Sequence, residues 1–158
     1  MIVVVMGVSG SSKTTLGRAL AARLGCRFLD GDDFHPPANV EKMRAGVPLD
    51  DADRAPWLER LNGELRGGGD AVLACSALKQ RYRDALARGV PDVRLVHLRG
   101  SVELIAARLA QRRHRYMPAT LLQSQFDALE APGNAIDVDV AEAADRCLER
   151  IVDGLRGS

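Results

Sequence analysis

Short apolar runs alternate along the chain with longer segments whose apolar residues recur at helical spacing. The clearest run, Ile2–Met6, is apolar throughout and rich in β-branched residues, as expected of a strand buried on both faces of a sheet. The clearest helix, Lys13–Leu24, has leucines at every fourth position and is followed by Gly25, a residue type that commonly ends helices.

The same patterns predict further strands and helices. The strands are Arg27–Asp30, Ala71–Cys75, Val93–Leu98 and Ile136–Val140. The helices are Pro36–Ala45, Asp53–Arg66, Leu78–Arg88, a segment from Ser101 to about Arg112, Pro118–Leu129 and Ala141–Leu155. This alternation is typical of a parallel sheet covered by helices on both faces. We therefore expect a single α/β domain over residues 1–158, a three-layer α/β/α fold with a five-stranded parallel sheet.

Composition excludes several other classes of protein. The net charge is +1 and 46% of the 158 residues are hydrophobic, so the chain is too apolar for disorder and has no global field for nucleic acid or an anionic membrane. The first apolar run is too short to span a membrane, and no basic segment precedes it as in a signal peptide. Three cysteines without a CxxC pair favour a cytoplasmic protein with reduced thiols.

A phosphate-binding loop is predicted directly after the first strand. Residues 7–14 (GVSGSSKT) match GxxxxGK[ST] at seven of eight positions, in the required strand–loop–helix context. In such a loop, backbone N–H groups surround phosphate oxygens, the lysine reaches the β- and γ-phosphates, and the last hydroxyl binds Mg²⁺. The residues assigned to ATP on this basis are Gly7, Val8, Ser9, Gly10, Ser11, Ser12, Lys13, Thr14 and Thr15.

The one mismatch is Ser12, which stands where the pattern has glycine. A Cβ there would lie where the backbone approaches the phosphates, or φ would need a value that serine disfavours. The expected consequence is weaker ATP binding or a misplaced γ-phosphate. The alternative is a strand-to-helix turn that binds no ligand.

The carboxylates expected of a kinase follow the second strand. No strand ends in the apolar run plus Asp-Glu of motor and switch NTPases, which argues against a helicase or transport ATPase and for a small kinase. Asp30 and Asp32 alternate out from the second strand at its carboxyl end, where ligands of open α/β sheets collect. The alternative for Asp32, and still more for Asp33, is to cap the helix that begins near Pro36.

Several motifs together closely resemble the gluconate kinases, small kinases with the nucleoside-monophosphate-kinase fold. Beside the phosphate loop they are DGDDFHP at 30–36, PLDDADRAPWL at 48–58, CSALK at 75–79, Tyr82-Arg83-Asp84 and Tyr116-Met117-Pro118. The resemblance runs from about Val3 to Pro132 and implies phosphorylation of D-gluconate at O6 with ATP and Mg²⁺. Besides Ser12, the chain departs from the family pattern at Arg115, where the family usually has a histidine, and His114 is shifted one position back.

The resemblance also implies roles for individual residues. Asp32 is the candidate catalytic base beside Lys13, and Asp30 is expected to hold Mg²⁺ through water together with Thr14. The helical segment at about 34–66 is expected to bind the acceptor. The residues assigned to gluconate, whose carboxylate and hydroxyls need fixed cations and hydrogen-bond partners, are Asp32, His35, Arg54, Ser76, Lys79 and Arg83. For each arginine the alternative is a solvated surface side chain.

A cluster of arginines is expected to form a lid, at about 112–118, that closes over ATP. Arg108 and Arg112 share a helix face and are predicted to contact the phosphates or the adenine; the alternative is a solvated basic helix end. Lys42 is interpreted as a surface charge or a contact made on closure, and Trp57 as a core residue.

The sequence thus predicts a cytoplasmic gluconate kinase that uses ATP and Mg²⁺, with no nucleic acid or membrane as partner. Related kinases are often dimers, which makes a homodimer one expectation. Two alternatives stay open: a small kinase for another acceptor such as shikimate, and a nucleotide-binding protein that lost turnover through Ser12. Against shikimate, the chain has Cys75-Ser76-Ala77 in place of the glycine triplet that shikimate kinases carry after the third strand.

Overall fold

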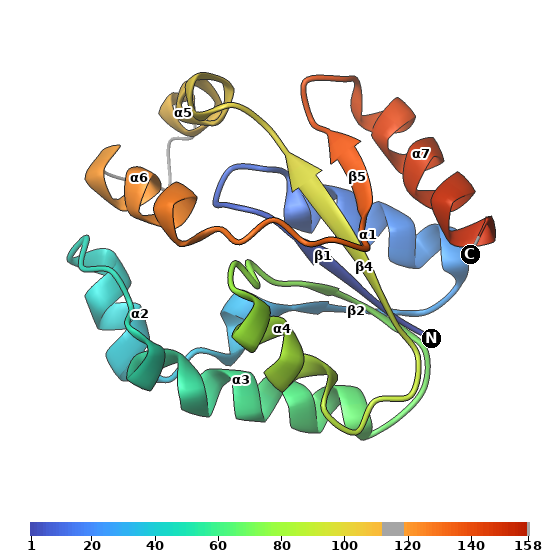
Figure 1. The fold of residues 1–158 in the computed structure, drawn as a ribbon, viewed down its shortest axis with the longest axis horizontal. Coiled ribbons are helices and arrows are strands. Elements are labelled where there is room, and N and C mark those ends of the chain that lie inside the picture. The colour runs from blue at the N-terminus through green and yellow to red at the C-terminus, as the bar shows by residue number, and fades with distance from the viewer. Residues whose placement is uncertain (112–118, 158) are drawn as a thin grey trace.

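The computed structural model of the chain describes residues 1–111 and 119–157. In this part of the chain five strands form one parallel sheet in the order β2-β3-β1-β4-β5 (Figure 1). The strands are β1 Ile2–Met6, β2 Arg27–Asp30, β3 Ala71–Ala74, β4 Val93–Arg99 and β5 Ile136–Asp139. The predicted α/β class and five-stranded parallel sheet are confirmed.

Helices connect the strands and cover both faces of the sheet. They are α1 Lys13–Leu24, α2 Pro37–Arg44, α3 Asp51–Arg66, α4 Gln80–Ala87, α5 Val102–Ala110, α6 Ala119–Ala128 and α7 Ala144–Arg156, with a short 3-10 helix, η1, at Gly31–Phe34. Figure 1 shows α1 and α7 on one side of the sheet and α3 and α4 on the other.

The alternation of side chains along β1 supplies both halves of the core. Val3 and Val5 pack into one apolar cluster with residues of α1 and α7, whereas Val4 and Met6 pack into a second cluster with residues of α3 and α4. All residues of β1 are buried, because it is the middle strand and pairs with β3 and β4. This burial explains why its sequence is continuously apolar rather than alternating.

Helices α3 and α4 begin elsewhere than predicted, each for a local reason. Helix α3 starts at Asp51 instead of Asp53, because Asp50 caps it: the Asp50 carboxylate accepts from the Asp53 N–H, and the Asp53 carboxylate accepts from the Asp50 N–H. Helix α4 starts at Gln80 instead of Leu78, because Ala77 has a left-handed φ of 47° and Lys79 is extended.

Other boundaries differ by up to three residues. Ser101 caps α5 as predicted, accepting from the Leu104 N–H, but the helix ends at Ala110 rather than about Arg112. Helix α7 starts three residues later than predicted because Ala143 is extended. The 3-10 helix η1 was not predicted, and the expected helix start at Pro118 lies outside the described residues.

Polar contacts join α2 to α3 within the segment predicted to bind the acceptor. The Lys42 ammonium forms an ion pair with the Asp53 carboxylate at 2.8 Å, and the Asn39 side-chain amide donates to the Asp53 carbonyl at 2.9 Å. Lys42 is therefore a surface cation engaged with a helix-capping carboxylate. No helix among the described residues is both long and apolar enough to cross a membrane.

The cysteines carry free thiols. Cys75, just after β3, is fully enclosed, and its burial raises the pKa of the thiol to about 12. A thiol of such high pKa stays protonated at neutral pH and is a poor nucleophile, so Cys75 serves as a packing residue.

Asn62 provides a test of how α3 and α4 are held together. Its side chain is 3% exposed, and its amide donates to the carbonyls of Leu86 at 2.9 Å and Arg88 at 2.8 Å, at the end of α4. Asn62→Ala should lower the free energy of unfolding by about 2 kcal/mol, because two carbonyls lose their donor. Urea denaturation measures this change. The control is Glu59→Ala at an exposed position of the same helix; equal stability of the two variants would contradict the assignment.

Candidate active site

The carboxyl ends of β1, β2 and β3 bring the predicted site residues to one edge of the sheet. The loop at residues 7–12 follows β1, Asp30 ends β2, and Ser76 comes shortly after β3. A backbone hydrogen bond from the Gly7 N–H to the Ser76 carbonyl, at 3.3 Å, ties two of these segments together. This edge is where open parallel sheets bind their ligands.

The phosphate loop closes around the carbonyl of Val8. This oxygen accepts from the Ser11 hydroxyl at 2.7 Å and from the Lys13 ammonium at 2.9 Å. Helix α1 begins at Lys13, so its first N–H groups and the lysine face the same loop. The arrangement is that of an anion site at a helix N-terminus, and it combines the positive end of the helix with the Lys13 ammonium.

Ser12 adopts the conformation that the glycine pattern requires. Its φ is 72° and its ψ is 27°, in the left-handed region, and its side chain makes no capping hydrogen bond to α1. For a non-glycine residue this left-handed conformation is roughly 1–2 kcal/mol less favourable than the right-handed one. The predicted backbone conflict at Ser12 is therefore present in the loop.

Thr14 and Asp30, both predicted to hold Mg²⁺, lie within hydrogen-bond distance of each other. The Thr14 hydroxyl donates to one oxygen of the Asp30 carboxylate at 3.3 Å, and the other oxygen accepts from the Asp32 N–H at 3.0 Å. A hydroxyl and a carboxylate beside a phosphate loop suit Mg²⁺, which prefers oxygen ligands and keeps several of its waters. Among the described residues no group of three or more His, Cys, Asp or Glu side chains could hold a metal by itself.

Asp30, rather than Asp32 or Asp33, caps the helix that follows β2. It is the N-cap of η1, while α2 begins after Pro36 without any side-chain cap. The alternative of helix capping for Asp32 and Asp33 is therefore wrong. Asp32 lies exposed in the first turn of η1, two residues beyond the Asp30 carboxylate.

His35 lies flat against Trp57, with ring centroids 4.1 Å apart and planes at 14°. Burial lowers the pKa of His35, while the charge of Asp32 acts in the opposite direction, so the imidazole is neutral at pH 7. The Asn39 amide nitrogen, which donates to the Asp53 carbonyl, also lies 3.2 Å from His35 Nδ1. Nδ1 is then the acceptor, and Nε2–H is left as a donor.

Trp57 is a structural residue, as predicted. It is 2% exposed, and its indole N–H donates to the Gly31 carbonyl at 2.8 Å. It thereby holds η1, with Asp32, against α3.

Arg54 and Lys79 come together around the ring of Tyr82. The Arg54 guanidinium carbon lies 5.2 Å from the ring centroid, and the Lys79 ammonium lies 5.8 Å from it. Arg81 lies at 5.8 Å as well, and the Tyr82 hydroxyl donates to the Asp51 carboxylate at 2.5 Å. We call these five residues the Tyr82 cluster.

Charge in the Tyr82 cluster is partly balanced by Asp51. The hydrogen bond from Tyr82 and the charges of Arg81 and Lys79 lower the pKa of the Asp51 carboxyl, with the Tyr82 bond as the largest cause. Arg81 forms an ion pair with Asp51, and the Lys79 ammonium lies 3.9 Å from it. Three cations against one carboxylate leave an excess of positive charge, which suits an anionic ligand.

Sequence reasoning assigned no role to Asp51, Arg81 or Tyr82. Tyr82 and Asp51 lie within the quoted motifs, which is the one signal that pointed to them. Arg81 had no signal, because a lone helical arginine cannot be told from a solvated one before its neighbours are known.

Arg83 is placed apart from the Tyr82 cluster. Its side chain is buried, and its guanidinium donates to the carbonyls of Ala77 and Glu130, each at 2.8 Å, and to the Gln80 side chain at 3.2 Å. Successive helix residues point about 100° apart, which separates Arg83 from Tyr82. The contacts make Arg83 a brace for the loop after β3.

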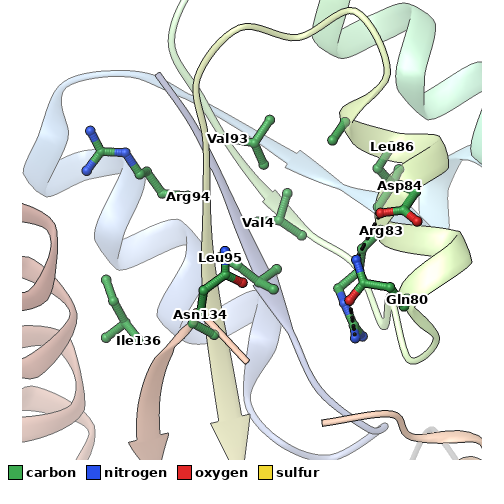
Figure 2. Close-up of a pocket in the computed structure, with 12 residues that line it drawn as sticks. Val4, Gln80, Arg83, Asp84, Leu86, Val93, Arg94, Leu95, Asn134 and Ile136 are labelled. Carbon is green, nitrogen blue, oxygen red and sulfur yellow. Dashed lines mark hydrogen bonds between the residues drawn. The ribbon is translucent and has the colours of Figure 1, made fainter. Parts of the chain in front are cut away.

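Arg83 also lines a cavity of about 410 Å³ away from the phosphate loop (Figure 2). Val4 and Leu95 form its floor on the sheet, and Asn134 lies at the segment before β5. None of the residues of the phosphate loop or of the Tyr82 cluster lines this cavity.

The remaining predicted residues are Ser76, Arg108 and Arg112. Ser76 is half-buried beside the phosphate loop, to which its carbonyl is bonded. Arg108, on α5, donates to the carbonyl of Val140 just after β5. Arg112 and the predicted lid at 112–118, with His114 and Arg115, lie outside the described residues.

One contact of the phosphate loop was not foreseen. The side chain of Gln125, from α6, makes two hydrogen bonds to Ser9. Gln125 lies within the stretch from about Val3 to Pro132 that resembles the family, but the sequence attached no role to it.

Known proteins resemble this chain over most of its length. The AAA domain family matches residues 2–132. A gluconokinase of Gluconobacter oxydans is 47% identical over 94% of this chain and 88% of that protein, and the thermosensitive gluconokinase of Escherichia coli is 43% identical over 94% of this chain and 86% of that protein.

Solved structures give the same relationship. A gluconokinase from Sinorhizobium meliloti has a TM-score of 0.92 at 41% identity, covering 98% of this chain and 90% of that one. A shikimate kinase from Bacteroides thetaiotaomicron reaches a TM-score of 0.73 at 17% identity, over 99% of this chain and 98% of that one, which shows a shared fold alone. With near-full-length identity above 40% and a phosphate loop beside a cationic cluster, the chain belongs to the gluconokinase family of P-loop kinases.

Proposed function

We propose that this chain transfers the γ-phosphoryl group of ATP to O6 of D-gluconate, producing ADP and 6-phospho-D-gluconate. The observations that support the proposal are a phosphate loop whose Thr14 hydroxyl reaches Asp30, two residues before Asp32, and a group of cations around Tyr82. These cations come from α3, from the loop after β3 and from α4. The family relationship supports the same reaction.

The Tyr82 cluster suits the carboxylate of the acceptor. Arg54 and Lys79 supply charged donors; both lie against the Tyr82 ring, Arg54 also donates to the Tyr82 hydroxyl, and Lys79 lies near Asp51. His35 Nε2–H and the Ser76 hydroxyl are additional donors for the hydroxyl groups of a polyol chain. A linear sugar acid needs this combination of fixed cations and polar partners.

The nucleotide phosphates would be held by the N–H groups of the loop and by Lys13, which exchanges the Val8 carbonyl for a phosphate oxygen. Thr14 directly, and Asp30 through water, would hold Mg²⁺, which neutralises charge on the phosphates when bound. Arg108, Arg112 and a lid at 112–118 remain predicted contacts of ATP.

Asp32 is the proposed catalytic base. It is exposed, is held at the sheet edge by its backbone hydrogen bond to Asp30, and performs no capping. There its carboxylate can orient the attacking hydroxyl and accept its proton while the phosphoryl group transfers in line, without a covalent intermediate.

A second candidate function rests on Ser12. The left-handed φ of this serine is a cost that a glycine would not carry, and it favours, as the alternative, a nucleotide-binding protein with impaired turnover. A cytoplasmic location and a homodimer remain predictions.

A coupled ADP-release assay tests the function. The purified protein with Mg²⁺ and ATP should release ADP with D-gluconate and should show little release with shikimate or nucleoside monophosphates. Turnover with shikimate alone would show that shikimate, and not gluconate, is the acceptor. No turnover with any of them, combined with stabilisation by ATP, would favour the non-catalytic alternative.

Ser12→Gly should raise kcat/KM for ATP. Glycine removes the Cβ from the place where the backbone approaches the phosphates, and the gain is expected to be up to about tenfold, the equivalent of roughly 1.4 kcal/mol. Steady-state kinetics with varied ATP measures it. An unchanged or lower value would show that the loop accommodates the serine at no cost.

Asp32→Asn should lower kcat by about 100-fold or more, because the amide can orient the hydroxyl but cannot take its proton. The matched control is Asp33→Asn, at the adjacent exposed aspartate, whose kcat should stay within about twofold of the parent protein. Near-normal turnover of Asp32→Asn would contradict the assignment of Asp32 as the catalytic base.

A further inference from the structure

Gln125 contacts the phosphate loop from a helix far away in the sequence. Its side-chain oxygen accepts from the Ser9 N–H at 2.8 Å, and its side-chain nitrogen lies 3.1 Å from the Ser9 hydroxyl oxygen. One side chain thus binds both the backbone and the side chain of a single loop residue, across 116 positions of sequence.

The Ser9 backbone decides which way this amide faces. An N–H group can only donate, so the Gln125 oxygen must face it, and the Gln125 nitrogen must then face the Ser9 hydroxyl. The hydroxyl oxygen accepts from Gln125, and its own proton is therefore directed elsewhere. The Ser9 N–H, by contrast, is already used and is not available to a phosphate.

Ser9 lies in the loop between two buried residues, Val8 and Gly10, and is itself partly exposed. The Val8 carbonyl already accepts from Ser11 and Lys13. Bound ATP brings phosphate oxygens, which are hydrogen-bond acceptors, to this loop. The Ser9 hydroxyl, whose oxygen is held by Gln125, is suited to donate its proton to one of them.

Helix α6 is firmly held where it presents Gln125. Leu121 and Leu122 are buried, and Glu130, two residues past the end of the helix, is bonded to the loop after β3. The Glu130 N–H donates to the Leu78 carbonyl at 2.7 Å, and its carboxylate accepts from the Gln80 N–H at 2.8 Å.

Arg83 completes this attachment by donating to the Glu130 carbonyl. Helix α6 is therefore connected at one point to the loop that carries Lys79 and at another to the phosphate loop. A side chain on such a support is held more precisely than one on a free loop.

We propose that Gln125 is a positioning residue for phosphoryl transfer, which holds Ser9 so that its hydroxyl donates to the γ-phosphoryl group of ATP. The inference depends on the proposed function only in taking gluconate as the acceptor of the phosphoryl group. It assigns the backbone N–H of Ser9 to Gln125 and the hydroxyl of Ser9 to the nucleotide, which revises the role expected of this residue in the loop.

The variant that tests this is Gln125→Met, which keeps the volume and length of the side chain and removes both hydrogen bonds. The matched control is Gln123→Met on the same helix, where the exposed glutamine donates to Asp127. Binding of the Mg²⁺ complexes of a non-hydrolysable ATP analogue and of ADP is measured by calorimetry without any acceptor.

The expected result is that Gln125→Met binds the ATP analogue about tenfold more weakly, as for the loss of one hydrogen bond to a charged group, and ADP within about twofold of the parent. Gln123→Met should change neither. Equal weakening of both nucleotides would reduce Gln125 to a structural role, and no weakening of either would overturn the proposal.

Ser9→Ala provides the second measurement. If Gln125 acts through the Ser9 hydroxyl, Gln125→Met should weaken binding of the ATP analogue much less in a Ser9→Ala background than in the parent protein. Additive effects would contradict the proposal. These binding results hold whether or not gluconate is the acceptor, and lack of turnover with gluconate would instead count against the proposed function.

Discussion

The structure depends on the burial of β1 in the middle of a parallel sheet. Because β1 is covered on both faces and paired on both edges, its end is fixed in space, and the phosphate loop starts from that point. Parallel pairing also requires β2 and β3 to end at the same edge. The strand order alone therefore places Asp30 and the loop after β3 at this edge.

Precision at this edge comes from hydrogen bonds between segments that are distant in sequence. Trp57 holds η1 through the Gly31 carbonyl, Arg83 braces the loop after β3 through Ala77, and Gln125 holds Ser9. Each of these side chains satisfies backbone groups that would otherwise be buried without a partner or left to move. The strand ends position the segments of the site, and hydrogen bonds from helical side chains on both sides of the sheet then hold them in place.

Local sequence patterns were enough to predict the position of residues that a strand end or a loop motif places directly. The pairing of Thr14 with Asp30 follows from a loop after one strand and a carboxylate at the end of another, and the left-handed φ of Ser12 follows from the glycine pattern. Arg83 shows where this reasoning stopped. It lies in a family motif beside Tyr82, but the turn of a helix sends its guanidinium to backbone carbonyls.

By itself, the sequence determined the order of the elements, the parallel sheet, the phosphate loop and the family, because apolar periodicity and contiguous motifs are local properties of the chain. Only the tertiary structure decided that Asp51 balances the cations around Tyr82 and that Gln125 binds Ser9. The physical reason is that hydrogen bonds and ion pairs are short in range. Which donor meets which acceptor is settled only when packing has brought separate helices to the same edge of the sheet.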